Sequence, residues 1–175
     1  MVDARISKRG FTLIELMVTV AVLAILITVA IPNFQTFLLN SRMASQTNDV
    51  ITALSLARSE AVKRAANVTV CASSNSTTAT PTCTGGWAQG LIVRDAAGTV
   101  IRVQPALGGA STLSGGTDVA STITFTASGR TTIPTTATAP STTLRLCPPS
   151  PYVVQGRAIQ IEPTGRSNFT PVTCP

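Results

Sequence analysis

Residues 8–31 read KRGFTLIELMVTVAVLAILITVAI, a short basic start followed by a long apolar run. The run itself, residues 11–31, carries a single charge, Glu15. As an α-helix it would extend over roughly 30 Å, which matches one hydrocarbon core. We therefore predict a membrane-crossing helix over residues 11–31. Pro32 follows it, lacks a backbone donor and is expected to kink the helix.

An ordinary secretory signal is the alternative interpretation of this start. Such a signal has a basic beginning, an apolar stretch and small residues before its cleavage site, and residues 28–30, Thr-Val-Ala, could serve as that site. Two observations count against it. The apolar run is longer than usual, and Glu15 lies inside it, where an acidic residue costs roughly 2.5–3.5 kcal/mol on insertion scales. A carboxylate within a membrane is usually functional and paired.

The segment at residues 8–16, Lys-Arg-Gly-Phe-Thr-Leu-Ile-Glu-Leu, resembles the signature of type IV prepilins. The resemblance implies that residues 1–10 are a leader. A prepilin peptidase would cut between Gly10 and Phe11 and methylate the new N-terminus of Phe11. It also implies that Glu15 pairs with the N-terminal amine of a neighbouring subunit during assembly. Because both groups need partners in a low-dielectric bundle, the pair would fix the stagger between subunits.

Further segments are similar to the GspH/FimT group of minor pilins and pseudopilins. They are residues 57–64, 68–73, 86–90 and 161–166. The segment that holds Cys71, Cys83 and Trp87 is more similar to the FimT/FimU minor pilins than to the secretion pseudopilin. The resemblance implies a minor pilin that helps to initiate assembly of a type IV pilus, with pseudopilin H of the type II secretion system as the alternative.

The same resemblance implies where the protein acts and with what. We expect a single-pass protein of the bacterial inner membrane, with its head in the periplasm, that joins a pilus or pseudopilus. Its implied partners are other major and minor pilins or pseudopilins, the prepilin peptidase, and the inner membrane with its assembly platform.

Beyond Pro32, apolar residues recur at three- and four-residue steps, so an amphipathic helix is expected over residues 32–66. Its polar middle, residues 41–49, is either a solvated stretch or a weak point. The period then becomes strand-like, with candidate strands at residues 68–71, 91–94, 99–103, 122–126, 143–147 and 157–162. We predict an α+β fold of the type IV pilin kind: a long N-terminal helix packed on a mainly antiparallel sheet in the head, residues 67–175.

Four cysteines lie in the head, Cys71, Cys83, Cys147 and Cys174. An even number beyond a membrane-directing segment indicates two disulfides and an oxidising compartment, the periplasm. Sequence alone allows three connectivities. We favour Cys71–Cys83 and Cys147–Cys174, because each pair brackets one local loop. Buried free thiols are the other interpretation.

The chain is basic, with a net charge of +6. Without residues 1–10, which hold Arg5, Lys8, Arg9 and Asp3, the thirteen basic and seven acidic residues fall to ten and six, a net charge of +4. This balance is compatible with a polyanionic partner but does not require one.

Some FimT-type pilins resemble DNA receptors that use a C-terminal Gly-Arg-x-Arg motif. Residues 165–168 of this chain read Gly-Arg-Ser-Asn, so Asn168 replaces the second arginine. If they face one side, four arginines could neutralise phosphates of double-stranded DNA, namely Arg130, Arg145, Arg157 and Arg166. Otherwise they are solvated residues or subunit contacts.

Catalysis is not expected. The chain contains no histidine, which removes every histidine-based catalytic or metal site. Its cysteines lack Cys-x-x-Cys spacing, and no phosphate loop follows Gly85 and Gly86. We expect no cofactor and no metal. Trp87 is expected to be a core residue rather than a platform for a nucleic-acid base.

Overall fold

The computed structural model describes residues 11–152 and 154–174, without the side chains of residues 29–33. The expected leader, residues 1–10, lies outside this part of the chain, as does the side chain of Pro32. The backbone at Pro32 belongs to helix α1, Leu13–Arg64, and the kink there stays a prediction. Among the helical segments that the structure describes, none has both the length and the hydropathy of a membrane span.

The chain forms two compact units, Met1–Leu38 and Leu39–Pro175, here called the N-terminal and the C-terminal unit. Helix α1 contributes to both. In the N-terminal unit it begins beside Thr12, whose hydroxyl oxygen accepts the backbone N–H of Glu15 at 3.3 Å. This contact satisfies one of the free donors at the helix start.

In the C-terminal unit, α1 buries the apolar stripe that the sequence predicted, including Val50, Leu54 and Ala57. The polar middle of the helix is not a break. Met43 and Thr47 are fully buried there, and the Thr47 hydroxyl donates to the Met43 carbonyl at 2.7 Å. The helix ends at Arg64 rather than at residue 66, because Ala65 turns to φ +48°.

In the described part of the chain, eight strands and two short 3-10 helices follow α1. The strands are β1 Val68–Ala72, β2 Leu91–Asp95, β3 Val100–Gln104, β4 Thr112–Gly115, β5 Thr122–Phe125, β6 Thr143–Cys147, β7 Gly156–Ile161 and β8 Ser167–Val172. The 3-10 helices are η1 Trp87–Gln89 and η2 Thr117–Val119. All six predicted strands are present within a residue or so of their predicted ends.

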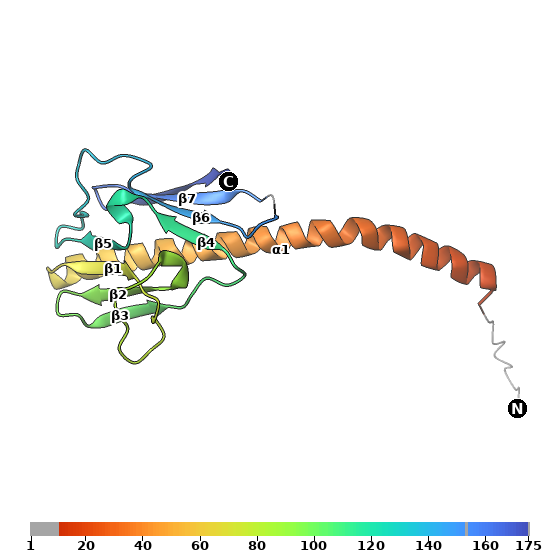
Figure 1. The fold of residues 1–175 in the computed structure, drawn as a ribbon, viewed down its shortest axis with the longest axis horizontal. Coiled ribbons are helices and arrows are strands. Elements are labelled where there is room, and N and C mark those ends of the chain that lie inside the picture. Colours follow the sequence, from red (N-terminus) through yellow and green to blue (C-terminus); the bar gives the residue numbers. More distant parts are fainter. Residues whose placement is uncertain (1–10, 153, 175) are drawn as a thin grey trace, which may run out of the picture. The chain divides into compact units, whose positions relative to one another are not determined.

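The strands form two four-stranded sheets rather than one. Sheet A has the order β3-β2-β1-β5 and sheet B the order β4-β6-β7-β8, and every neighbouring pair is antiparallel. Both sheets lie beside the C-terminal half of α1 (Figure 1). The predicted α+β fold, a helix packed on antiparallel sheets, is confirmed.

The core lies where the two sheets meet α1, and Trp87 is its largest member. Its side chain is 2% exposed, and its indole Nε1 donates to the carbonyl of Val119 at 2.9 Å. Leu144, Ile159 and Phe125 join the same core cluster from β6, β7 and β5. The expectation that Trp87 is a core residue is therefore confirmed.

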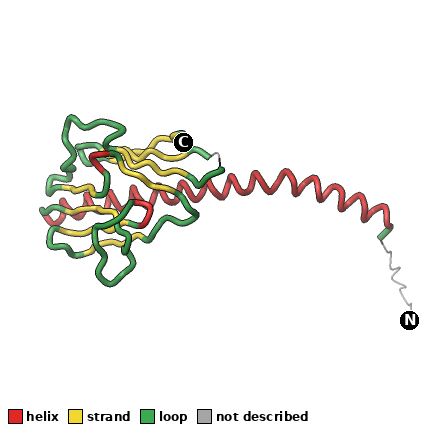
Figure 2. Tube along the Cα trace, in the orientation of Figure 1, coloured by secondary structure: helices red, strands yellow, loops and turns green. Residues whose placement is uncertain are grey.

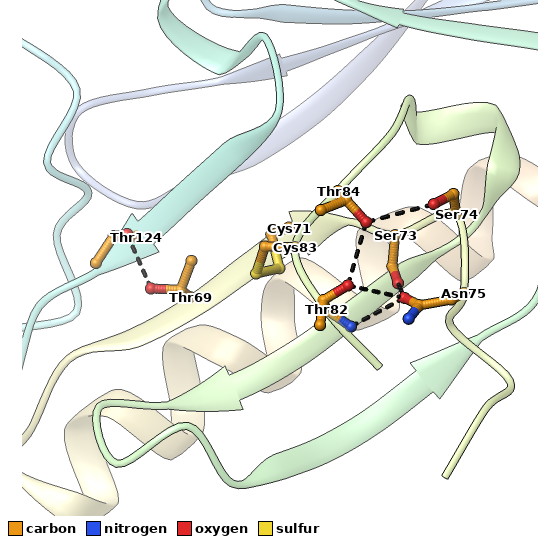
Figure 3. Close-up of a disulfide and its surroundings, with 9 residues drawn as sticks. All are labelled: Thr69, Cys71, Ser73, Ser74, Asn75, Thr82, Cys83, Thr84 and Thr124. Carbon is orange, nitrogen blue, oxygen red and sulfur yellow. Dashed lines mark hydrogen bonds between the residues drawn. A yellow bond between two sulfur atoms is a disulfide. The ribbon is translucent and has the colours of Figure 1, made fainter. Parts of the chain in front are cut away.

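The favoured disulfides, Cys71–Cys83 and Cys147–Cys174, are both formed. The first ties β1 to the long connection before η1, which Figure 2 shows as a loop. Figure 3 shows how Asn75 organises this loop: its Oδ1 accepts from the Ser73 hydroxyl at 3.0 Å and from the backbone N–H of Thr82 at 2.9 Å. For separations of 12 and 27 residues, chain entropy predicts about 3 and 3.5 kcal/mol of stabilisation.

Candidate functional site

The first turn of α1 places one carboxylate in an apolar surface. The neighbours of Glu15 along the chain, Ile14 and Leu16, are 67% and 59% exposed. The Glu15 carboxylate makes no hydrogen bond or ion pair to the described residues. Glu15 is the acidic residue in the first turn of α1, where the helix dipole has its positive end. Any partner for this carboxylate therefore lies outside the described residues.

The apolar side chains around Glu15 are exposed along the whole described first part of α1. Those at least 45% exposed are Phe11, Leu13, Ile14, Leu16, Met17, Val18, Val20, Val22, Leu23, Ile25, Leu26, Ile27, Phe34, Phe37 and Leu38. An exposed apolar surface of this extent marks a site of contact with lipid or protein. Phe11 is 82% exposed, while Gly10, on the other side of the predicted cleavage site, lies outside the described residues.

The four arginines considered for DNA do not form one surface. Arg145 on β6 is exposed and donates to the Thr173 carbonyl at 2.8 Å. Arg157 on β7 is paired with Leu146, so it points to the opposite, inner face of sheet B. There it is half-buried and donates to the carbonyl oxygens of Gln155 and Gly156.

Arg130 and Arg166 lie in two turns that touch each other. The backbone N–H of Thr131 donates to the Pro163 carbonyl at 3.1 Å, and the Thr131 hydroxyl donates to the Glu162 carbonyl at 3.2 Å. Arg157 is near the start of β7, whereas Arg166 follows its end. The condition that all four arginines face one side is therefore not met.

Sequence analysis missed the basic residues of α1 that accompany Arg166. Arg58 and Lys63 line one groove together with Arg166. On the sequence they lie mostly off the apolar stripe, which is equally typical of an ordinary solvated helix face. Only the packing of α1 against the turn between β7 and β8 brings the three together.

A cluster of ion pairs lies at the C-terminal end of α1. Glu60 accepts from Arg64 Nε at 2.8 Å and lies 3.3 Å from Lys63 Nζ, while Arg64 also reaches Asp95 at 3.1 Å. The hydrogen bonds from Arg64 and then from Lys63 hold the pKa of the Glu60 carboxyl below its usual value. This cluster joins the helix to the β2–β3 hairpin and offsets the charge of Lys63.

A helix that exposes apolar side chains around one carboxylate, and continues beneath two antiparallel sheets, defines the class of type IV pilin-like proteins. The chain belongs to the GspH family, since the family model for type II transport protein GspH matches residues 46–165. The prokaryotic N-terminal methylation motif matches residues 5–31. The predicted resemblance to the GspH/FimT group is thus confirmed.

Two crystal forms of the type IV minor pilin FimU from Pseudomonas aeruginosa (strain PAO1) are similar to this chain. One has a TM-score of 0.52 and 23% identity, covering 76% of this chain and 88% of FimU. The other has a TM-score of 0.49 and 21% identity, covering 76% and 93%. The first of these supports the fold. Among curated protein sequences, none matches this chain.

Proposed function

We propose that this protein is a minor pilin that is cut between Gly10 and Phe11, methylated at Phe11 and incorporated into a type IV pilus, where it helps to initiate assembly. The observation that carries the proposal is the N-terminal methylation motif over residues 5–31, which runs into a helix with a single carboxylate among exposed apolar side chains. The role is structural rather than enzymatic.

Before assembly, the protein resides in the bacterial inner membrane through residues 11–31, with its C-terminal unit in the periplasm. The length and apolar character of this run support the location. Two disulfides in the C-terminal unit agree with it, because disulfides persist in oxidising compartments. The prepilin peptidase and the assembly platform would be its partners at this stage.

Glu15 supplies a directional force for assembly. Apolar helices gain little by exchanging lipid for each other, so their association depends on close packing and on polar contacts. A carboxylate in lipid is costly and gains a partner when it meets the free N-terminal amine of an adjacent pilin-like subunit. Pairing fixes the axial stagger, and the surrounding apolar side chains then pack helix against helix.

The alternative to a type IV pilus is the pseudopilus of a type II secretion system, and a deletion experiment separates the two. The family model is named for type II transport, while FimU is a pilus protein. We expect deletion of the gene from its host to abolish or sharply reduce surface pili, with the chain found in sheared pili of the complemented strain. Secretion of extracellular enzymes should continue. Loss of secretion with normal pili would instead assign the protein to a type II secretion pseudopilus.

Binding of double-stranded DNA is the remaining candidate function, and it has less support. Its best observation is the basic character of the turn that holds Arg166, close to Arg58 and Lys63. Arg145 and Arg157 lie on opposite faces of sheet B, so they cannot add to the same phosphate track.

A further inference from the structure

A groove runs between the second half of α1 and the turn that joins β7 to β8. Its volume is about 660 Å³. Helix α1 contributes one wall and the turn the other, and the lining residues are Ile51, Ser55, Arg58, Ser59, Val62, Lys63, Gly165, Arg166 and Ser167. Among the described residues, no acidic one lines the groove. It therefore combines apolar side chains, hydroxyl groups and three cations.

Two of these cations have no partner in the described part of the chain. Arg58 and Arg166 form no ion pair or side-chain hydrogen bond there. Lys63 differs from them, because its Nζ forms an ion pair with Glu60 Oε1 at 3.3 Å. The nearest carboxylate along the chain to Arg166, that of Glu162, accepts from the Thr164 hydroxyl and does not line the groove. Arg58 and Arg166 thus give the groove an uncompensated positive charge.

Two glycines allow the turn that carries Arg166 to pack closely against the neighbouring turn. Gly129 and Gly165 have φ +74° and +83°, and a Cβ atom built on Gly165 would overlap the Gly129 carbonyl oxygen. The Arg58 side chain lies against both, because its Nε would be 3.3 Å from a Cβ on either glycine. The two turns also share the hydrogen bonds of Thr131. Arg58 therefore packs on both glycines, and the turn that carries Arg166 packs on the turn at Gly129.

The apolar part of the groove indicates a protein ligand. Val62 is 53% exposed and Ile51 is half-buried, so both offer apolar surface in the groove that the arginines line. The phosphates of duplex DNA lie on the outside of the double helix and would meet the guanidinium groups of the exposed Arg166 and the half-buried Arg58, which leaves this apolar surface in water. A segment with carboxylates next to aliphatic side chains satisfies both features.

We propose that this groove binds an acidic segment, with carboxylates beside aliphatic residues, of a different pilin-like subunit. A second copy of this chain is a poor occupant, because residues 11–175 carry a net charge of +4 and two copies repel each other. The inference rests on the proposed function, since it assigns the groove to contact between unlike subunits of one filament.

The test uses the processed full-length chain in detergent micelles and a short synthetic peptide in which glutamates alternate with leucines. Titration calorimetry gives its affinity for the unaltered protein and for Arg58→Gln/Arg166→Gln. We expect the double variant to bind about tenfold or more weakly, because it loses both charge partners. The matched control, Arg94→Gln/Arg102→Gln, removes two arginines of the β2–β3 hairpin and should bind within about twofold of the unaltered protein.

Further probes make the result specific. Arg58→Lys/Arg166→Lys keeps both charges and should retain most of the affinity, which separates loss of charge from misfolding. A peptide with glutamine in place of glutamate should bind weakly. Equal losses in the groove variant and the control would overturn the inference. So would tighter, arginine-dependent binding of a DNA duplex, which would make the groove a nucleic-acid site, or full competition by inorganic phosphate, which would make it a simple anion site.

Failure of this inference and failure of the proposed function give different results. If pili persist when the gene is deleted, the proposed role in a type IV pilus is wrong, whether or not the peptide binds. If pili are lost but the peptide binds equally to all variants, the pilin role stands and only the assignment of the groove is wrong.

Discussion

Replacing Glu15 with alanine is expected to leave insertion into the inner membrane intact and to reduce incorporation into pili by about tenfold or more. Insertion should become easier, because an acidic residue in the apolar run costs roughly 2.5–3.5 kcal/mol on insertion scales. Assembly should suffer, because removing one partner of a buried ion pair costs roughly 3–5 kcal/mol. The measurement is the ratio of protein in the sheared pilus fraction to protein in the inner membrane.

The matched control for this prediction is Glu60→Ala. It also removes one carboxylate from α1, but that carboxylate pairs with Arg64 and Lys63 inside the C-terminal unit. We expect it to enter pili at nearly the normal level. Glu15→Gln, which keeps the shape and loses the charge, should resemble Glu15→Ala. Normal incorporation of either Glu15 variant would contradict the role proposed for this carboxylate.

Replacing Trp87 with alanine is expected to lower the free energy of unfolding of the C-terminal unit by about 3–5 kcal/mol. The indole is 2% exposed and lies close to β4, since a Cβ atom built on Gly115 would be 2.9 Å from its Nε1. Truncation leaves a cavity and also removes the donor for the buried Val119 carbonyl. Denaturant unfolding followed by circular dichroism measures the loss.

Two further variants divide this effect into its parts. Trp87→Phe keeps much of the volume but not the N–H group, so it should cost about 1–3 kcal/mol. Phe169→Ala removes an aromatic ring that is 48% exposed and should cost about 1 kcal/mol or less. If Trp87→Ala is no more harmful than Phe169→Ala, the tryptophan does not stabilise the core as its burial and its hydrogen bond to Val119 imply.

Strands that are rich in β-branched residues could be predicted from the sequence, and two others could not. β4, Thr112–Gly115, has four residues, ends in glycine and contains a single apolar side chain, that of Leu113. β8, Ser167–Val172, contains Pro171 and mostly polar or exposed residues, which is typical of an edge strand. Both depend on pairing with β6 or β7, and a pattern within one segment does not contain that information.

The candidate site, too, could be predicted from the sequence only where it depends on local features. Glu15 and the two disulfides could be predicted, because a charge in an apolar run and cysteines around short loops are local features. The grouping of the arginines depends on the fold. Arg145 and Arg157 are separated by the two faces of sheet B, while Arg58 and Arg166, distant in sequence, share one groove. The state of the polar stretch of α1 could not be predicted for a similar reason, because the burial of Met43 and Thr47 depends on the packing of the whole C-terminal unit.

The most direct test of the account is the intact mass and N-terminal fragment spectrum of the protein purified from host membranes. We predict a chain that begins at Phe11 and carries one N-terminal methyl group. In a strain without the prepilin peptidase, the chain should keep Gly10 and the residues before it, and it should be absent from pili. An N-terminus at Ile31, or an uncut leader in cells that possess the peptidase, would contradict the account.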